Sequence, residues 1–179
     1  MKTDKKVSLT IQMKTGYMFN FLYWHSYHGI QGIINYGISA VAVILLLCNF
    51  MEDSETVRFW LIILALLFTV LNPALLYYKA VRQVTMTPMF KKPFTYSFDE
   101  QGFTVKQDGA TARASWSDVL LIRETGKIIA LYMGASNATI LPKDQCKENL
   151  AELKEFIRKG APEAAKNLKQ TGDNVCQNK

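Results

Sequence analysis

The most constraining feature of this sequence is an uncharged, strongly apolar segment at residues 59–78, bounded by Arg58 and Lys79. As a helix, its twenty residues would be about 30 Å long, which matches the hydrocarbon thickness of a lipid bilayer. Twelve of them are Leu, Ile, Phe or Val, and each favours insertion by about 0.3 to 0.6 kcal/mol. We therefore predict a transmembrane helix here, weakened but not abolished by Asn72 and Pro73.

A second uncharged run covers residues 15–51 and is most apolar at residues 40–47. We place one span at about residues 30–50 and the other at about 58–79, so that residues 15–82 would form an interfacial helix followed by a transmembrane hairpin. The alternative is a pair of helices buried in a soluble core. Such helices usually keep a polar stripe, and residues 59–71 have almost none.

Positive charges lie on both outer sides of the predicted hairpin. Four lysines precede it and four basic residues follow it up to residue 92, whereas the loop at residues 51–57 contains three acidic residues. Because loops rich in Lys and Arg stay in the cytoplasm, we expect both termini to be cytoplasmic and the protein to be multi-pass. Basic residues close to a membrane are attracted to its anionic lipid headgroups, which we therefore predict as a partner; a merely solvated basic face is the alternative.

Several residues in this region have predicted membrane roles. Aromatic rings favour the headgroup level, so residues 15–28 are predicted to form a helix along the inner surface, although a plain extension of the first span is the alternative. The predicted membrane anchors are Trp24, Trp60, Tyr77 and Tyr78. Small and amide side chains allow helices to pack closely, and the residues assigned to packing between the helices are Gly32, Asn35, Ser39 and Asn72. A transport path is the alternative role for the two asparagines, but neither span contains a charged residue between its ends.

From residue 83 to residue 160 the sequence predicts one small cytoplasmic domain. Apolar and polar residues alternate in short runs, and the turn signals Asp108-Gly109 and Thr125-Gly126 separate them. The predicted strands are at residues 94–98, 103–105, 110–116, 119–123, 128–133 and 139–141. After Pro142 the spacing of Leu150, Leu153 and Ile157 is helical. We therefore predict an α+β membrane protein whose small antiparallel barrel or sandwich is capped by a C-terminal helix.

Residues 1–14 contain a further strand pattern on the other side of the hairpin. Val7, Leu9, Ile11 and Met13 alternate with polar residues. Since charge places both ends of the hairpin on one side of the membrane, we predict that this strand pairs with the C-terminal sheet, against residues 84–86. Residues 161–179 are predicted to be a mobile tail.

Three short motifs and their order resemble the YcxB-like family of bacterial membrane proteins. They are the run at residues 94–98 followed by Gly102-Phe103, the sequence Trp-Ser-Asp-Val at 116–119, and Ile-Leu-Pro-Lys at 140–143. The resemblance implies a pleckstrin-homology-like (PH-like) fold and a bacterial plasma membrane location. It brings no established catalytic residue, cofactor or ligand. Trp116 is expected in the core and Asp118 in a turn.

The sequence shows little sign of catalytic chemistry. His25 and His28 are close enough in a helix to be a metal pair, but no further ligand is near them in sequence, so an interfacial role is the preferred interpretation. Asp99, Glu100 and Asp118 have turn-forming explanations. We expect no catalytic residues, no cofactor, no metal and no nucleic-acid partner, and the three scattered cysteines predict no disulfide framework.

The leading hypothesis is a membrane-anchored binding module that engages a protein partner or anionic headgroups, with Lys91, Lys92 and Lys143 as candidate contacts. The alternative is a subunit or regulator of a membrane transport assembly, including a homo-oligomer. An enzyme acting on lipid or envelope precursors would require clustered carboxylates in a pocket.

Overall fold

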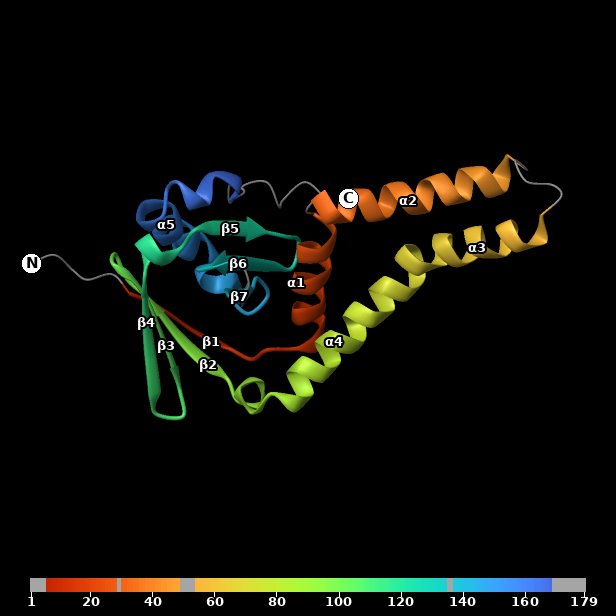
Figure 1. The fold of residues 1–179 in the computed structure, drawn as a ribbon. Coiled ribbons are helices and arrows are strands. Elements are labelled where there is room, and N and C mark those ends of the chain that lie inside the picture. Colours follow the sequence, from red (N-terminus) through yellow and green to blue (C-terminus); the bar gives the residue numbers. More distant parts are fainter. Residues whose placement is uncertain (1–5, 29, 49–53, 135–136, 169–179) are drawn as a thin grey trace, which may run out of the picture. The chain divides into compact units, whose positions relative to one another are not determined.

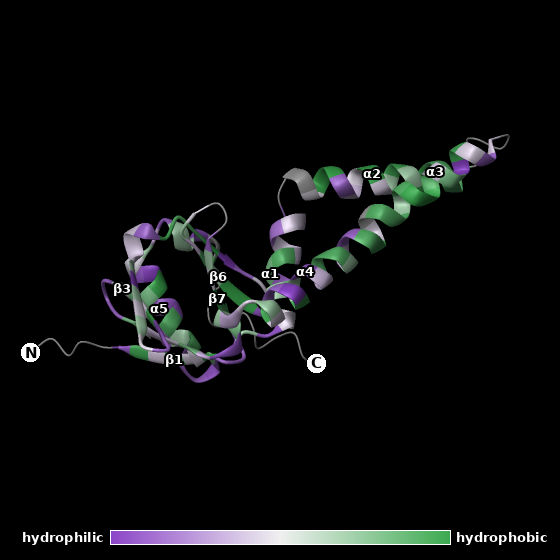
Figure 2. Ribbon diagram, turned by 60° about the horizontal axis from the view of Figure 1, so that its bottom comes forward, coloured by the Kyte–Doolittle hydropathy of each residue, from purple (hydrophilic) through white to green (hydrophobic). Residues whose placement is uncertain are grey.

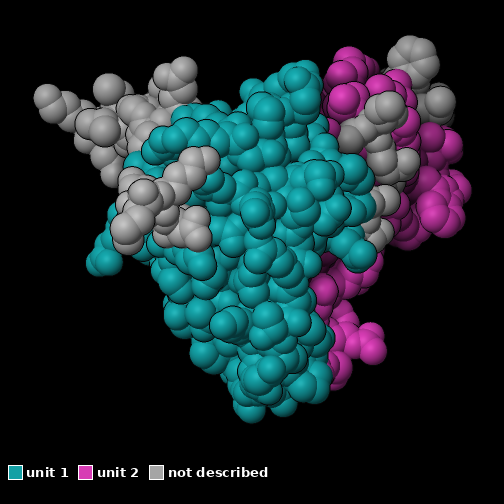
Figure 3. Space-filling view, turned by 90° about the vertical axis from the view of Figure 1, so that its left-hand side faces the viewer, with its two compact units in different colours: residues 1–17, 87–179 teal, residues 18–86 magenta. Residues whose placement is uncertain are grey.

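The computed structural model describes residues 6–28, 30–48, 54–134 and 137–168 (Figure 1). The chain divides into two compact units, which are coloured separately in Figure 3. One unit combines Met1–Tyr17 with Thr87–Lys179, and the other is Met18–Met86. The two ends of the chain therefore belong to the same unit, with the helical unit inserted between them.

The inserted unit is helical. After α1 (Thr15–Tyr27), whose first residues belong to the other unit, come α2 (Ile30–Leu47) and α3 (Glu55–Leu66), and a π-helical turn (Leu67–Leu71) joins α3 to α4 (Asn72–Met86). The helix from Glu55 to Met86 is 32 residues long and apolar enough to cross a membrane, with a mean hydropathy of 2.3 over its most apolar stretch. Only 12% of that stretch is buried, whereas a helix in a soluble core would be mostly covered. Figure 2 shows the ribbon of α3 coloured mainly as hydrophobic.

A second membrane-spanning segment is long and apolar enough only if two consecutive helices are counted together. The helix of residues 15–27 and that of residues 32–47 are bent by 77° relative to each other. Helix α1 covers nearly the same residues as the predicted interfacial helix at 15–28, and its axis differs in direction from that of α2. The two helices therefore do not form one continuous straight helix.

The π-helical turn has a local cause at Pro73. Proline has no N–H, and its ring clashes with the carbonyl four residues earlier, here that of Thr69. Widening the preceding turn relieves the clash without ending the helix. Asn72 and Pro73 thus reshape the long helix, which continues to Met86.

The other unit contains two antiparallel sheets. The first has four strands in the order β1-β2-β3-β4 and the second has three in the order β5-β6-β7. Their bounds are β1 Val7–Ile11, β2 Phe94–Phe98, β3 Gly102–Gln107, β4 Ala110–Ser115, β5 Leu121–Glu124, β6 Ile128–Tyr132 and β7 Ala138–Pro142. No closed barrel forms, so the barrel alternative is wrong and the arrangement is two separate sheets.

Short turns connect the strands as their sequences predict. Asp108 and Gly109 both have positive φ, 48° and 81°, which is the conformation that a two-residue hairpin between twisted strands requires. Asp99 accepts hydrogen bonds from the N–H groups of Gln101 and Gly102 in the β2–β3 turn. Asp118 accepts one from Ser115 N–H, at 2.9 Å, in a 3-10 turn (Trp116–Asp118). The turn roles predicted for Asp99 and Asp118 are confirmed.

One hydrophobic core joins both sheets and the C-terminal helix α5 (Leu150–Gly160). Trp116 is buried, as predicted; its ring stacks on Phe98 and lies against Phe103 in a tilted arrangement. A Cβ on Gly160 would lie 2.3 Å from the indole of Trp116, so a glycine is required where α5 meets this ring. The remaining 3-10 turns are Pro88–Lys91, Lys147–Asn149 and Ala164–Asn167.

Two predictions about the ends of this unit need correction. β1 pairs with β2, with Val7 opposite Phe98 and Ile11 opposite Phe94; residues 84–86 cannot take that place because they are the last turn of α4. The expected mobile tail is also wrong at its start, because four of its first residues are buried in the core: Ala161, Ala164, Ala165 and Leu168. Residues 169–179 lie outside the described residues.

Candidate functional site

The predicted membrane residues lie in the helical unit. Ser39 is buried and donates to Ala65 O at 3.2 Å, and Asn72 Nδ2 donates to Tyr27 Oη at 3.0 Å. A Cβ on Gly32 would come within 2.2 Å of Tyr27 O, and Asn35 is half-buried. Ser39 and Asn72 thus bond to another helix of this unit, whereas the close approach of Gly32 is to a residue five positions earlier at the bend between α1 and α2. Trp60, Tyr77 and Tyr78 are exposed.

The two histidines form ring stacks. His25 stacks on Phe21 and His28 on Trp24, the fourth predicted anchor, with ring centroids 5.9 and 4.5 Å apart. Within the described part of the chain, no group of three His, Cys, Asp or Glu residues could hold a metal ion. The structure therefore gives the His25–His28 pair no further ligand in those residues.

The unit that contains the two sheets, Met1–Tyr17 with Thr87–Lys179, is called the β unit below. Its strongest electrostatic feature is a carboxylate shared by two lysines. Glu124 lies at the end of β5, Lys143 follows β7, and Lys154 is on α5. The Nζ atoms of Lys143 and Lys154 are 2.6 and 2.8 Å from Glu124 Oε1. The side chains of Glu124 and Lys154 are fully buried, and that of Lys143 is 11% exposed. This cluster, the Glu124 triad, joins α5 to the three-stranded sheet.

The two ammonium groups decide the charge of the buried acid. Burial by itself raises the pKa of Glu124, but the hydrogen bonds and positive charges of Lys143 and Lys154 outweigh it and hold the pKa below its usual value. Glu124 is thus a carboxylate at neutral pH and is fixed as a structural ion pair. Lys143, which was predicted to contact headgroups, has its ammonium group directed into the triad.

The other two predicted headgroup lysines lie in the segment after α4. Lys91 ends a 3-10 turn and is exposed. Lys92 Nζ is 2.8 Å from Asp108 Oδ2, and both side chains are mostly exposed. Such an exposed pair contributes little stability and can exchange partners. The structure does not bring Lys143 together with Lys91 and Lys92 in any described contact.

A groove of about 400 Å³ runs between β1 and the segment after β7. Ser8, Leu9 and Thr10 form one wall, and residues 144–149 form the other. At one end Gln145 closes the groove: its Oε1 accepts from Gln12 N–H at 2.8 Å, and its Nε2 donates to Gln12 O at 2.9 Å. We call this feature the β1 groove.

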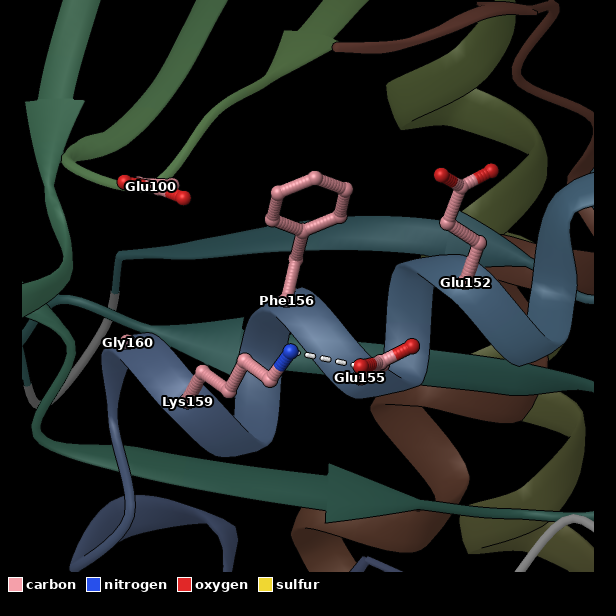
Figure 4. Close-up of a pocket in the computed structure, with 6 residues that line it drawn as sticks. All are labelled: Glu100, Glu152, Glu155, Phe156, Lys159 and Gly160. Atoms are coloured by element: carbon pink, nitrogen blue, oxygen red, sulfur yellow. Dashed lines mark hydrogen bonds and ion pairs between the residues drawn. The ribbon is translucent and has the colours of Figure 1, made fainter. Parts of the chain in front are cut away.

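A second pocket, of about 300 Å³, borders α5. Figure 4 shows its lining residues Glu100, Glu152, Glu155, Phe156, Lys159 and Gly160, with Phe156 and Glu152 projecting from the same side of the helix. Lys159 Nζ bonds to Glu155 at 2.6 Å. The lining brings together three carboxylates, those of Glu100, Glu152 and Glu155, which is the arrangement that the enzyme alternative requires. Among the described lining residues there is no Ser, Cys, Thr or His.

Cys146, which borders the β1 groove, is not an activated nucleophile. Its thiol is buried, and burial, reinforced by the charge of Asp144, raises its pKa to about 11. The thiol therefore stays protonated at neutral pH, whereas catalytic cysteines react as thiolates.

Sequence reasoning missed the Glu124 triad and the Gln145 bridge. Lys154 carried a signal, because it lies between Leu153 and Ile157 on the inward face of α5. A lysine on an apolar helix face predicts a buried carboxylate partner. The sequence does not indicate which carboxylate Lys154 meets. It also does not indicate that Gln145 bonds to Gln12, because these two residues are 133 positions apart and meet only in the folded chain.

These features define an α+β domain with two antiparallel sheets and a C-terminal helix, into which a largely apolar helical unit is inserted. Residues 98–157 match the family model described as YcxB-like protein. The match starts at the end of β2 and ends in α5, so it covers most of the β unit and about a third of the chain. No curated protein and no solved structure matches the chain.

Proposed function

We propose that the protein is a membrane-anchored interaction module, in which a transmembrane hairpin holds a PH-like domain at the cytoplasmic face of the bacterial plasma membrane and this domain binds a protein partner. The observation that carries the proposal is the insertion of the helical unit between the neighbouring strands β1 and β2. The domain would be tied to the bilayer by two connections. PH-like scaffolds host many activities, so the role rests on this chain's surfaces.

Both connections are fastened by amide side chains of the domain. Before the hairpin, Gln12 is bridged to Gln145 and also donates to Phe90 O at 2.8 Å. After it, Gln107 Nε2 donates to Met89 O and Lys92 O, at 2.6 and 2.9 Å. These bonds fix the chain on entry to and exit from the hairpin, which supports an anchor that positions the domain.

A protein partner is favoured over headgroups by the state of the lysines. Lys143 is committed to the buried Glu124, which leaves Lys91 and Lys92 of the three candidate headgroup contacts. The membrane lipid then serves mainly as solvent for the hairpin. The transport alternative gains no support from Asn72, because its amide bonds to Tyr27 within the helical unit.

The proposal is tested by photo-crosslinking the full-length chain in cell membranes. A photoreactive residue is placed in turn at Ser8, Thr111 and Lys147, all exposed, and at Leu47 in the hairpin as a control. We expect a discrete protein adduct, dependent on light, from at least one domain position. If the domain positions give only lipid adducts, and binding to nanodiscs containing anionic lipid falls in the Lys91→Ser/Lys92→Ser variant, headgroups are the ligand and the proposal is wrong.

A further inference from the structure

We propose that the outer edge of β1 binds an extended segment of a partner protein, which adds to the four-stranded sheet as a fifth strand. This inference rests on the proposed function and names the surface that would carry it. β1 is the end strand of its sheet, with β4 at the opposite edge (Figure 1). An end strand has one row of main-chain N–H and C=O groups without a neighbouring strand.

The direction of these groups follows from the strand register. In antiparallel pairs, residues that bond to the neighbouring strand alternate with residues whose main chain points the other way. Asp99 N–H donates to Gly102 O across the β2–β3 turn, so the odd-numbered residues of β2 face β3. Its even-numbered residues face β1, where their partners are Val7, Leu9 and Ile11. The main chains of Ser8 and Thr10 therefore point outward.

The bonds between Gln12 and Gln145 indicate independently that the main chains of the even-numbered residues of this segment point outward. Burial alternates without a break along residues 7–13, so the chain stays extended from β1 to Met13 and Gln12 has the orientation of Ser8 and Thr10. The Gln145 carboxamide takes both a donor and an acceptor of Gln12, as a peptide group of an adjacent strand would. One position of the outer edge is thus occupied by an amide of the chain itself.

The next two outward positions open into the β1 groove. Ser8 and Thr10 are exposed and line its volume of about 400 Å³. Across the described ranges, no main-chain group pairs with the outer side of β1 at these residues. The opposite wall is polar, with Asp144, Lys147, Glu148 and Asn149. Such a groove fits the backbone of an extended peptide, with main-chain bonds giving affinity and the polar wall giving selectivity.

β4 provides a matched control, because it is the other edge of the same sheet. Its two-residue turn at Asp108-Gly109 makes Gln107 and Ala110 a bonded pair, so Thr111 and Arg113 point outward on β4 as Ser8 and Thr10 do on β1. Proline is tolerated in an edge strand where its missing N–H faces outward. Thr10→Pro and Thr111→Pro each remove one outward N–H from one edge and leave the ladder bonds intact.

The test uses the full-length chain in nanodiscs and a phage-displayed library of random ten-residue peptides. Peptides selected on the wild-type chain are synthesised, and their affinities are measured for Thr10→Pro, Thr10→Val and Thr111→Pro. We expect about a tenfold or greater loss with Thr10→Pro, because the ring removes a donor and occupies its place. Thr10→Val and Thr111→Pro should bind as the wild type does. A bound peptide should also slow hydrogen exchange at the amides of Ser8 and Thr10 and not at Thr111.

Folding is checked separately by the fluorescence of the buried Trp116, which all three variants should keep. Peptides that bind Thr10→Pro as tightly as wild type, peptides that protect Thr111, or a selection that yields no specific peptide would overturn the edge assignment. If the wild-type chain self-associates and Thr10→Pro does not, the occupant of the β1 edge is a second copy of this chain, and the assignment to a partner protein is wrong. In each case crosslinking to a protein partner would still support the proposed function, whereas its absence at every position removes that function.

Discussion

Replacing Glu124 with Gln is expected to lower the free energy of unfolding of the β unit by about 3 to 5 kcal/mol. The substitution keeps the side-chain shape but removes the charge that compensates the fully buried Lys154 and the nearly buried Lys143. A buried ammonium group without a carboxylate is strongly unfavourable. The measurement is urea unfolding of the full chain in detergent micelles, followed by Trp116 fluorescence in a Trp24→Phe/Trp60→Phe background.

The matched control removes all three charges of the Glu124 triad. In Glu124→Leu/Lys143→Met/Lys154→Met none of the triad's charges remains inside, so stability should return close to that of wild type, as found when apolar residues replace buried ion pairs. Loss of less than about 1 kcal/mol in Glu124→Gln, at the level of an exposed pair, would contradict the assignment of the Glu124 triad as a buried anchor of α5.

The ion pairs of Glu124 with Lys143 and Lys154 also predict how stability depends on pH. The pKa of Glu124 in the folded chain is lowered from its ordinary value of 4.5, so the unfolded state takes up the proton first as the pH falls. The stabilisation is fully present above pH 4.5 and is lost as the pH falls through the lowered folded value. The stability difference between wild type and Glu124→Gln should therefore be constant around pH 7 and shrink in acid.

Replacing Ile11 with Ala is expected to destabilise the β unit by about 2 to 5 kcal/mol. Ile11 is the last residue of β1, has 0% exposure, and pairs with Phe94 across the inserted hairpin. Its truncation leaves a cavity in the core that both sheets share. The control Thr10→Ala changes an outward, exposed neighbour and should stay within about 0.5 kcal/mol of wild type. Equal effects of the two substitutions in urea unfolding would show that β1 is not an integral strand of the domain.

Local patterns in the sequence predicted much of the β unit. Alternation at residues 94–98, the Asp108-Gly109 turn and the spacing of Leu150, Leu153 and Ile157 each depend on neighbours a few residues away. The corresponding strand, hairpin and helix are present. The apolar segment at residues 59–78 also lies in a single long helix, although that helix extends beyond it on both sides.

The partner of β1 and the candidate site could not be predicted because they depend on contacts between distant segments. The alternation of residues 7–13 fits any free sheet edge equally well, so its pairing with β2 was not determined. Glu124, Lys143 and Lys154 are separate charged residues in the sequence, and only folding places two amines on one carboxylate oxygen. Sheet closure depends on small angles that sequence patterns do not encode, and here two sheets remain.

Single-cysteine labelling in intact cells tests most directly whether the hairpin crosses the membrane with the β unit inside. Cys48 and Cys176 are replaced by Ser, the buried Cys146 is kept, and one new cysteine is introduced as Ser54→Cys, before α3, or as Thr111→Cys, on the exposed β4. A membrane-impermeant maleimide should label Ser54→Cys in intact cells and Thr111→Cys only after permeabilisation. Labelling of Thr111→Cys in intact cells, or protection of both positions there, would contradict a membrane-anchored cytoplasmic domain.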